Sequence, residues 1–212
     1  VPPGMLVVSG DVLLVFDHLQ LSFPQEGVVG VAAAAPVDMA RRHGVYVSGE
    51  RSRAVRAYLH KPGPDELERW HAIAADGTVQ IDTGLLWFDA GSVRRLVGLT
   101  QNEHVARLCG LVPRDEARPG GIHLYADLLF PLARSTTFER YLADTSDGPA
   151  TADIQAARRV IWQALRDTPL SAERLQPAFF AHLGTSLEYW RLLTDNAEAA
   201  RTCAWTNQAA TW

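Results

Sequence analysis

The alternation of apolar and polar residues divides the first half of the chain into strand-length segments. Residues 5–8 and 28–35 are continuous apolar runs, and the second has the length of a strand that is covered on both faces of a sheet. Residues 54–61 alternate instead, so Val55 and Ala57 are expected on the same face of a strand. Further strands are predicted at 43–48, at 78–88 with an interruption at 82–84, and within 168–181.

Helical spacing of apolar residues marks the second half. It is found within 92–111, and 124–132 and 138–142 are shorter apolar helix candidates. An amphipathic helix is predicted from an N-cap at Asp153 to about residue 166. Two further helices are predicted, a short one from Pro64 and another at 187–193. Strands that alternate with helices indicate the α/β class.

Composition narrows the class of protein. The chain has 212 residues, 47% apolar and 21% charged, which suits one globular domain or one with a small appendage. A net charge of −4 gives no basic surface for nucleic acid or an anionic membrane. No apolar run approaches the ~20 residues of a membrane span. Cys109 and Cys203 lack metal-ligand spacing and indicate no disulfide framework, so a reducing cytoplasm is predicted.

Asp11 is the first residue that invites a chemical interpretation. It follows an apolar strand in the segment Ser9-Gly10-Asp11, and a buried carboxylate without a partner would cost several kcal/mol. It is either the cap of a turn or a metal-binding carboxylate at the edge of an α/β sheet, where open sheets hold their ligands. The Rossmann fingerprint, the Walker loop, the nucleophile elbow and a zinc cluster are all absent from the sequence.

Several short motifs gain meaning from their order. They are Ser9-Gly10-Asp11, Arg42-His43-Gly44-Val45, His60-Lys61-Pro62, Ile81-Asp82-Thr83-Gly84, Leu124-Tyr125-Ala126-Asp127 and His182-Leu183-Gly184-Thr185-Ser186. In this order and at these separations they resemble the fucose-1-phosphate guanylyltransferase (GDP-fucose pyrophosphorylase) domain of bifunctional L-fucokinases, within the sugar-nucleotidyltransferase superfamily. The resemblance implies a Rossmann-like three-layer α/β/α fold with a predominantly parallel mixed sheet.

The resemblance also implies a reaction and its participants. L-fucose 1-phosphate would attack the α-phosphorus of GTP, giving GDP-L-fucose and pyrophosphate, with Mg²⁺ as cofactor. Catalysis of this kind rests on positioning and charge neutralisation. Asp11 corresponds to the carboxylate that holds the metal, because a hard cation prefers carboxylate oxygen. Lys61 corresponds to the lysine that contacts the sugar phosphate, although His60 stands where relatives carry Glu, and a solvated lysine before a turn is the structural alternative.

The remaining site residues are expected to bind substrate. Asp82 and Gly84 match the segment that contacts the sugar, and a β-bulge is the structural alternative. His43 and Gly44 match a position near base or sugar, and a turn that begins a strand explains them equally well.

The His182-Leu183-Gly184-Thr185 segment departs from the wider superfamily. Many members carry a metal-binding Asp at the position of His182. Imidazole is a poor Mg²⁺ ligand, so His182, with Gly184 and Thr185, is predicted to contact phosphate or sugar, or else to be a structural histidine. Asp127 is expected to cap or pair within the fold.

The resemblance further predicts how the chain is organised. Residues 1–193 would form an incomplete nucleotidyltransferase domain, because the superfamily's glycine-rich phosphate loop would lie upstream, and the isolated chain is expected to be inactive. Residues 194–212 would be an extension or the start of a following domain, since family members continue into a β-helix and a kinase domain. Trp190, Trp205 and Trp212 cluster near the end of the chain and indicate either an interface or docking of the tail onto its own domain. The alternatives are a degenerate scaffold or sugar-phosphate sensor attached to an L-fucokinase, and a nucleotidyltransferase for heptose or mannose.

Overall fold

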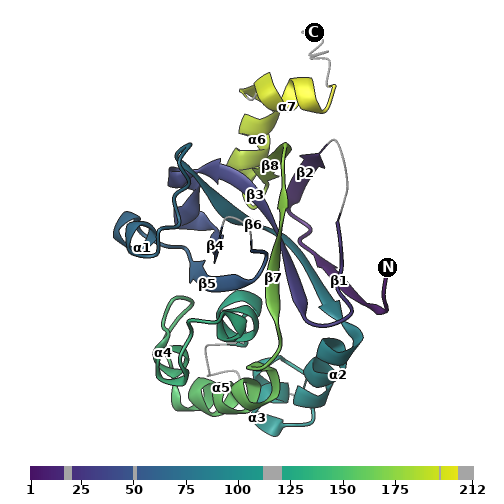
Figure 1. Cartoon of the computed structure of the whole chain (residues 1–212), viewed down its shortest axis with the longest axis vertical. Helices are drawn as coiled ribbons and strands as arrows, with labels where there is room; N and C mark the ends of the chain where they lie inside the picture. Colours follow the sequence, from purple (N-terminus) through teal and green to yellow (C-terminus); the bar gives the residue numbers. More distant parts are fainter. Residues whose placement is uncertain (17–20, 50–51, 112–120, 196, 205–212) are drawn as a thin grey trace.

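Strands from both ends of the chain meet in one mixed sheet (Figure 1). The computed structural model describes residues 1–16, 21–49, 52–111, 121–195 and 197–204. Within them the sheet has the order β5-β4-β6-β3-β7, and β1 also pairs with β6. Its strands are β1 (Gly4–Val8), β3 (Val28–Pro36), β4 (Gly44–Ser48), β5 (Val55–His60), β6 (Thr78–Asp89) and β7 (Leu170–Leu175). A separate antiparallel ribbon joins β2 (Val12–Phe16) to β8 (Ala178–His182).

The long strand β6 changes its partner part-way along one edge. Its other edge pairs with β3 from Thr78 to Phe88. On the first edge, Ile81 pairs with Val45 of β4, whereas the segment from Leu85 onward pairs with β1. Residues 82–84 therefore lie where β4 has left β6 and β1 has not yet joined it. A break of this kind opens a crevice at a sheet edge, because the two flanking strands diverge.

The α/β class and the mixed sheet are confirmed, but the prediction that the sheet is predominantly parallel is wrong. Of the pairings within the described sheet, only that of β3 with β7 is parallel. Parallel neighbours need a long crossover. Here β3 reaches β4 through the short 3₁₀ turn η1 (Val37–Arg42), and β4 reaches β5 through a loop. Only β7, which follows a long helical segment, returns parallel to β3.

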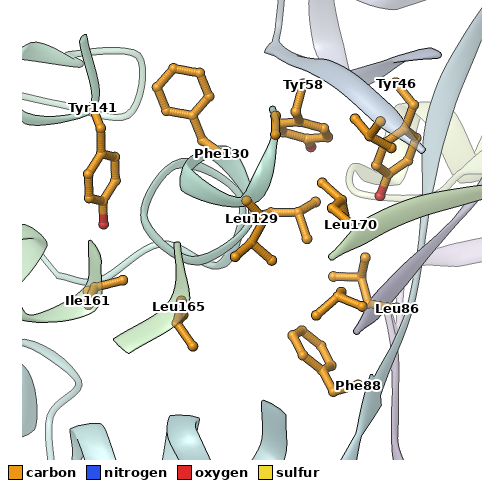
Figure 2. Packing of buried hydrophobic residues seen from close by; sticks show 14 of the residues in the cluster. Tyr46, Tyr58, Leu86, Phe88, Leu129, Phe130, Tyr141, Ile161, Leu165 and Leu170 are labelled. Carbon is orange, nitrogen blue, oxygen red and sulfur yellow. The ribbon is translucent and has the colours of Figure 1, made fainter. Parts of the chain in front are cut away.

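Helical segments cover both faces of the sheet, which confirms the three-layer prediction. On one face, Phe130, Tyr141 and Ile161 pack with Tyr58 and Phe88 of the sheet (Figure 2). The segments on this face are α2 (Ala90–Leu99), α3 (Glu103–Leu108), the π-helical turn η2 (Leu124–Leu129), η3 (Phe130–Leu132), α4 (Phe138–Ala143) and α5 (Ala152–Leu165).

The opposite face is covered more thinly. There η1 and α1 (Pro64–Arg69) contribute Ala40 and Leu67, which pack against Val47 and Ile81. Each fully buried aliphatic side chain of this kind stabilises the fold by about 1.5–3 kcal/mol.

Local chemistry corrects three sequence predictions. Helix α5 is capped by the Thr151 side chain, which accepts a hydrogen bond from the Ile154 N–H, and not by Asp153. The helical stretch predicted at 92–111 is two helices, because the first ends at Leu99 and the Asn102 side chain caps the second. Val55 belongs to the face of Tyr58 and not to that of Ala57, because a register shift between β4 and β5 adds a residue there. Strand β2 was not predicted.

The C-terminal helices α6 (Ser186–Thr194) and α7 (Ala197–Thr202) extend past β8 (Figure 1). Leu192 and Ala199 pack with Phe179, whereas Trp190 is 58% exposed. Trp205, Trp212 and the connection 112–120 lie outside the described residues. Among the described residues, no helix combines the length and apolar character needed to cross a bilayer. Both cysteines are free thiols.

Candidate functional site

A cavity of about 300 Å³ opens where β6 changes its partner. Its walls come from segments far apart in the sequence: the turn between β1 and β2, the start of β4, the end of β5, the middle of β6, and β8. The polar residues that line it are Ser9, Asp11, Arg42, His43, His60, Lys61, Asp82, Thr83, His123, Tyr125, Asp147 and His182.

The structure brings most of the predicted site residues together here. Asp11, Lys61, His43, Gly44, Asp82, Gly84 and His182 all line the cavity. The two others stand behind it. Gly184 contacts the His182 ring so closely that a Cβ would lie 2.4 Å from Cε1. The Thr185 side chain caps α6 by accepting a hydrogen bond from the Glu188 N–H.

Asp82 is a buried carboxylate in the cavity wall, only 4% exposed. Tyr46 donates a hydrogen bond of 2.6 Å to Oδ2, and the Gly84 N–H donates one of 2.7 Å to Oδ1. Tyr58 donates a longer one of 3.4 Å to Oδ2. Burial raises the pKa of Asp82 to about 6, although these three hydrogen bonds act in the opposite direction.

Glycines make room for the groups around Asp82. A Cβ on Gly30 would lie 2.1 Å from the Tyr46 hydroxyl, and a Cβ on Gly44 would lie 1.9 Å from that of Tyr58. Gly84 has φ +79°, and a Cβ there would come within 2.6 Å of Ser9. These positions therefore need glycine for packing, and Gly84 also needs it for its backbone conformation.

Asp11 ends the turn that Ser9 begins. The Ser9 hydroxyl donates to Oδ1 of Asp11, and Nε2 of His182 lies 3.2 Å from Oδ2. The hydrogen bond from Ser9, with the interaction of His182, lowers the pKa of the Asp11 carboxyl. The Asp11 side chain is 47% exposed, so an ionised carboxylate faces the cavity.

His43 and His182 meet edge to face, with ring centroids 5.4 Å apart. Burial, followed by the nearby His182 and Arg42, lowers the pKa of His43 to about 4. His43 is thus a neutral ring at physiological pH. A second cavity of about 510 Å³ shares Arg42, His43, Phe180 and His182 with the first. Its other lining residues come from η1, β8, α6 and the residue that follows α6.

Lys61 also lines the cavity, and its own backbone conformation is strained. It follows the last residue of β5 with φ +50°, a conformation that costs a residue with a side chain about 1–2 kcal/mol. Its N–H donates to the His43 carbonyl, which ties the ends of β4 and β5 together. Its Nζ lies 3.1 Å from Oδ1 of Asp147, the same oxygen that Nε2 of His60 contacts at 2.9 Å.

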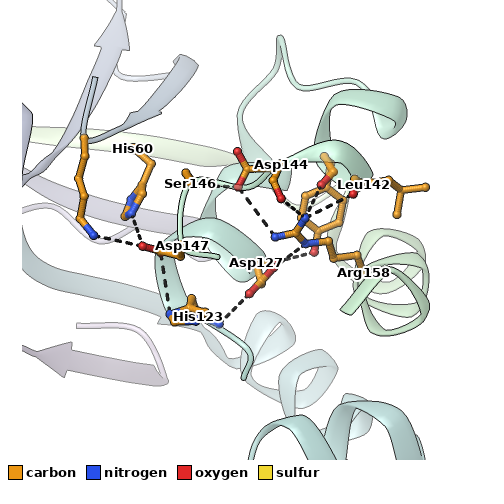
Figure 3. Close-up of polar contacts among 10 residues, drawn as sticks. His60, His123, Asp127, Leu142, Asp144, Ser146, Asp147 and Arg158 are labelled. Atoms are coloured by element: carbon orange, nitrogen blue, oxygen red, sulfur yellow. Dashed lines mark hydrogen bonds and ion pairs between the residues drawn. The ribbon is translucent and has the colours of Figure 1, made fainter. Parts of the chain in front are cut away.

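The segment that carries Asp147 is anchored to the helical layer by a buried ion pair (Figure 3). Nε of Arg158 donates to Asp127 at 2.7 Å, and its Nη1 donates to the carbonyl of Asp144 at 2.6 Å. The Asp127 carboxylate also accepts a hydrogen bond from the His123 N–H. The expectation that Asp127 pairs within the fold is therefore confirmed.

Comparison with known proteins now settles the family. The sequence profile of the family described as "Fucose pyrophosphorylase domain" matches residues 1–212, the whole chain. This chain belongs to the fucose pyrophosphorylase domain family. The resemblance inferred from the motifs is confirmed, and the family supports a nucleotidyl-transfer function.

Two known proteins are similar to parts of this fucose pyrophosphorylase domain. A protein of Arabidopsis thaliana named "Bifunctional fucokinase/GDP-fucose pyrophosphorylase" is 30% identical over 91 residues, which cover 39% of this chain and 9% of that protein. The chain thus matches about a tenth of the length of that relative. The crystal structure of a nucleoside-diphosphate-sugar pyrophosphorylase from Vibrio cholerae RC9 aligns with a TM-score of 0.37 and 11% identity, over 88% of this chain and 55% of that one.

Among the cavity carboxylates, Asp11 is the candidate ligand for a magnesium ion. Asp82 already accepts three hydrogen bonds, and Asp147 is engaged by His60 and Lys61. Asp11 is the most exposed of the three. Within the described part of the chain, no three His, Cys, Asp or Glu side chains cluster as a metal site. The donor set suits Mg²⁺, which takes one or two carboxylates and completes its shell with waters and phosphates.

Sequence reasoning missed Asp147, His123 and Tyr125 as cavity residues. Tyr125 lies in a motif that was singled out, and its ring stacks beside those of Tyr58 and His60. Asp147 precedes Gly148 and Pro149 in a polar connection, a pattern that is typical of an ordinary turn. Only the fold brings that turn against the end of β5.

Proposed function

We propose that this domain transfers a guanylyl group from GTP to L-fucose 1-phosphate. A phosphate oxygen of the sugar phosphate forms a bond to the α-phosphorus of GTP, the bond from that phosphorus to the bridging oxygen breaks, and pyrophosphate leaves with the electron pair. The products are GDP-L-fucose and pyrophosphate. Membership of the family supports nucleotidyl transfer, and the choice of these two substrates extends it.

One observation carries the proposal: an ionised carboxylate and a lysine line the same small cavity. Asp11 and Lys61 approach it from different strands. Lys61 is also the only lysine in the sequence, and the other residues counted as Lys or Arg are all arginines. An ammonium binds phosphate as a compact point charge, whereas a guanidinium forms a planar fork, so the two are not interchangeable. Lys61 is therefore the group that would bind the sugar phosphate.

The other residues of the cavity would orient the reactants. Neutral His43 packs against the ring of His182, and His182 lies beside Asp11, from where it would contact the phosphate. The backbone of 82–84 forms the wall against which the sugar lies. Asp11 would hold Mg²⁺, which supplies charge neutralisation at phosphate oxygens when bound. Since such catalysis depends on positioning, fixed elements around the cavity favour it.

Ligand-induced stabilisation of the 212-residue chain tests the proposal. Thermal unfolding is measured with Mg²⁺ and L-fucose 1-phosphate, mannose 1-phosphate or GDP-L-fucose. A ligand at 100 times its dissociation constant adds about 2.7 kcal/mol to the free energy of unfolding. L-fucose 1-phosphate and GDP-L-fucose are expected to stabilise the wild type but not Lys61→Met. Arg69→Met, which removes an exposed cation from α1, is the matched control and should bind normally.

Each other result has a definite meaning. Stabilisation by mannose 1-phosphate alone would replace fucose as the substrate, and no stabilisation by any of the three would refute the proposal. Pyrophosphate release from GTP and L-fucose 1-phosphate would show an enzyme and overturn the prediction that the chain alone is inactive, whereas binding without release fits both that prediction and a module that only senses sugar phosphates. Since the relative from Arabidopsis thaliana carries a fucokinase name, we propose that the domain works beside a kinase that supplies its sugar phosphate.

A further inference from the structure

Asp147 has an arrangement that differs from those of the other two cavity carboxylates. Both donors that it receives, Nε2 of His60 and Nζ of Lys61, contact the same oxygen, Oδ1. Among the described groups, the nearest partner of Oδ2 is Nδ1 of His123 at 3.9 Å, which is beyond hydrogen-bond length. Oδ2 therefore keeps its lone pairs available in the cavity that Asp147 lines.

Asp82, the carboxylate that the family resemblance assigned to the sugar, has fewer lone pairs available for a ligand. It is 4% exposed, and donors contact both of its oxygens. A sugar hydroxyl would have to compete with the Tyr46 and Tyr58 hydroxyls for Oδ2. Asp147 is 14% exposed and has one oxygen free of such competition.

The tautomer of His60 supports an ionised Asp147. The His60 side chain is 8% exposed, and its Nδ1 is buried with no hydrogen-bond partner among the described residues. A proton on Nδ1 would leave a buried N–H without an acceptor, which is costlier than a buried lone pair in the opposite tautomer, where Nε2–H donates to Asp147. The hydrogen bonds from His60 and Lys61 hold the pKa of Asp147 below its ordinary value, against the opposing effect of burial.

Resting on the proposed function, we infer that Asp147 is the residue that selects a sugar phosphate over bare phosphate. Oδ2 accepts a hydrogen bond from a ring hydroxyl while Lys61, held by Oδ1, binds the phosphate of the same molecule. In a hexose 1-phosphate the phosphate and the nearest hydroxyl are on adjacent carbons, so one carboxylate and the lysine beside it can contact both.

Electrostatics give this arrangement its selectivity. A carboxylate beside Lys61 offsets the attraction of the ammonium for any phosphate, and a bound hydroxyl compensates for that loss only when a sugar is attached. Specificity by a penalty against the wrong ligand is a general device of binding sites. The anchor formed by Arg158 and Asp144 fixes the segment before Asp147, so the carboxylate keeps its position without ligand.

The single lysine makes a direct test possible. Chain labelled with ¹³Cε-lysine gives one lysine side-chain NMR signal, which belongs to Lys61 and needs no assignment. Wild type and Asp147→Asn are titrated with L-fucose 1-phosphate and with inorganic phosphate. Loss of a hydrogen bond to a charged acceptor weakens binding by about ten- to hundredfold. Asp147→Asn is expected to show this loss for L-fucose 1-phosphate and to bind inorganic phosphate at least as tightly as wild type.

The controls separate the possible failures. Asp65→Asn, which removes an exposed carboxylate from α1, should match wild type for both ligands. If Asp147→Asn weakens both ligands equally, Asp147 only orients Lys61 and the inference is wrong. If the wild-type signal responds to neither ligand, the proposed function fails, and the inference fails with it. If Asp147→Asn does not fold, Asp147→Glu replaces it, because this variant keeps the charge but moves the carboxylate. Asp147→Glu must then lose affinity for L-fucose 1-phosphate and keep its affinity for inorganic phosphate.

Discussion

The Lys61 ammonium lies 3.1 Å from the Asp147 carboxylate. Lys61 comes from the end of a strand and Asp147 from a turn between two helices of the opposite layer. The pair therefore links the sheet to its helical cover in the wall of the cavity. Because Lys61 is 48% exposed, the ion pair itself stabilises the fold by only about 0–1 kcal/mol.

Asp11→Asn tests the metal site. The side chain is about half exposed, so the fold should persist and the free energy of unfolding should change by less than about 1 kcal/mol. Stabilisation by L-fucose 1-phosphate should lose its dependence on Mg²⁺, because the amide is a weaker ligand for a hard cation. Thermal unfolding with and without Mg²⁺ measures this, and an unchanged Mg²⁺ dependence would move the metal away from Asp11.

Asp82 makes the stability of the chain depend on pH in an unusual direction. Its pKa is raised from 3.8 to about 6 in the folded chain, so the folded state binds the proton more tightly than the unfolded state does. The contribution of Asp82 to the free energy of unfolding therefore falls by about 3 kcal/mol as pH rises from about 4 to 6. Denaturant unfolding of wild type and Asp82→Asn across this range checks the difference. Parallel curves for the two proteins would contradict it.

Gly44→Ala should destabilise the fold and displace the Tyr58 side chain next to the cavity. Its Cβ would meet the Tyr58 hydroxyl at 1.9 Å, and such overpacking costs about 1–3 kcal/mol. Gly98→Ala is the matched control, because no atom lies within 4 Å of its Cβ and alanine is favoured in the helix α2 by about 1 kcal/mol. Urea unfolding should give opposite signs for the two variants, and equal effects would show that Tyr58 moves aside freely.

Arg158→Met should be the most destabilising of these changes. The Arg158 and Asp127 side chains are 4% and 1% exposed, and breaking a buried ion pair costs about 3–5 kcal/mol because the remaining charge is left unpaired. Adding Asp127→Asn removes that charge and should restore part of the loss. A double-mutant cycle by chemical denaturation measures the coupling, and additive effects would mean that the two side chains act independently.

The sequence predicted the elements with strong local patterns. The apolar run that became β3 is buried on both faces as expected, and the segment from Ser9 to Asp11 forms a turn at a strand end. Seven residues that the motifs singled out line one cavity, since each lies at the end or the break of a strand. The roles of those residues in binding stay predictions.

Strand pairing, in contrast, was beyond local patterns. Nothing in the sequence near Asp82 indicates that β4 and β1 share one edge of β6 and leave a gap between them, because pairing depends on where distant strands pack. The same holds for Asp147, whose turn is unremarkable until the Arg158–Asp127 ion pair holds it against β5.

The sequence by itself thus determined the α/β class, the family and the chemical types available, because these depend on short-range periodicity and on motif order. The tertiary structure alone decided that the sheet is mainly antiparallel, that Asp82 is buried among tyrosines, and that Asp147 faces Lys61. Each of these results from contacts between segments far apart in the chain, where burial and hydrogen-bond competition, not local propensity, set the outcome.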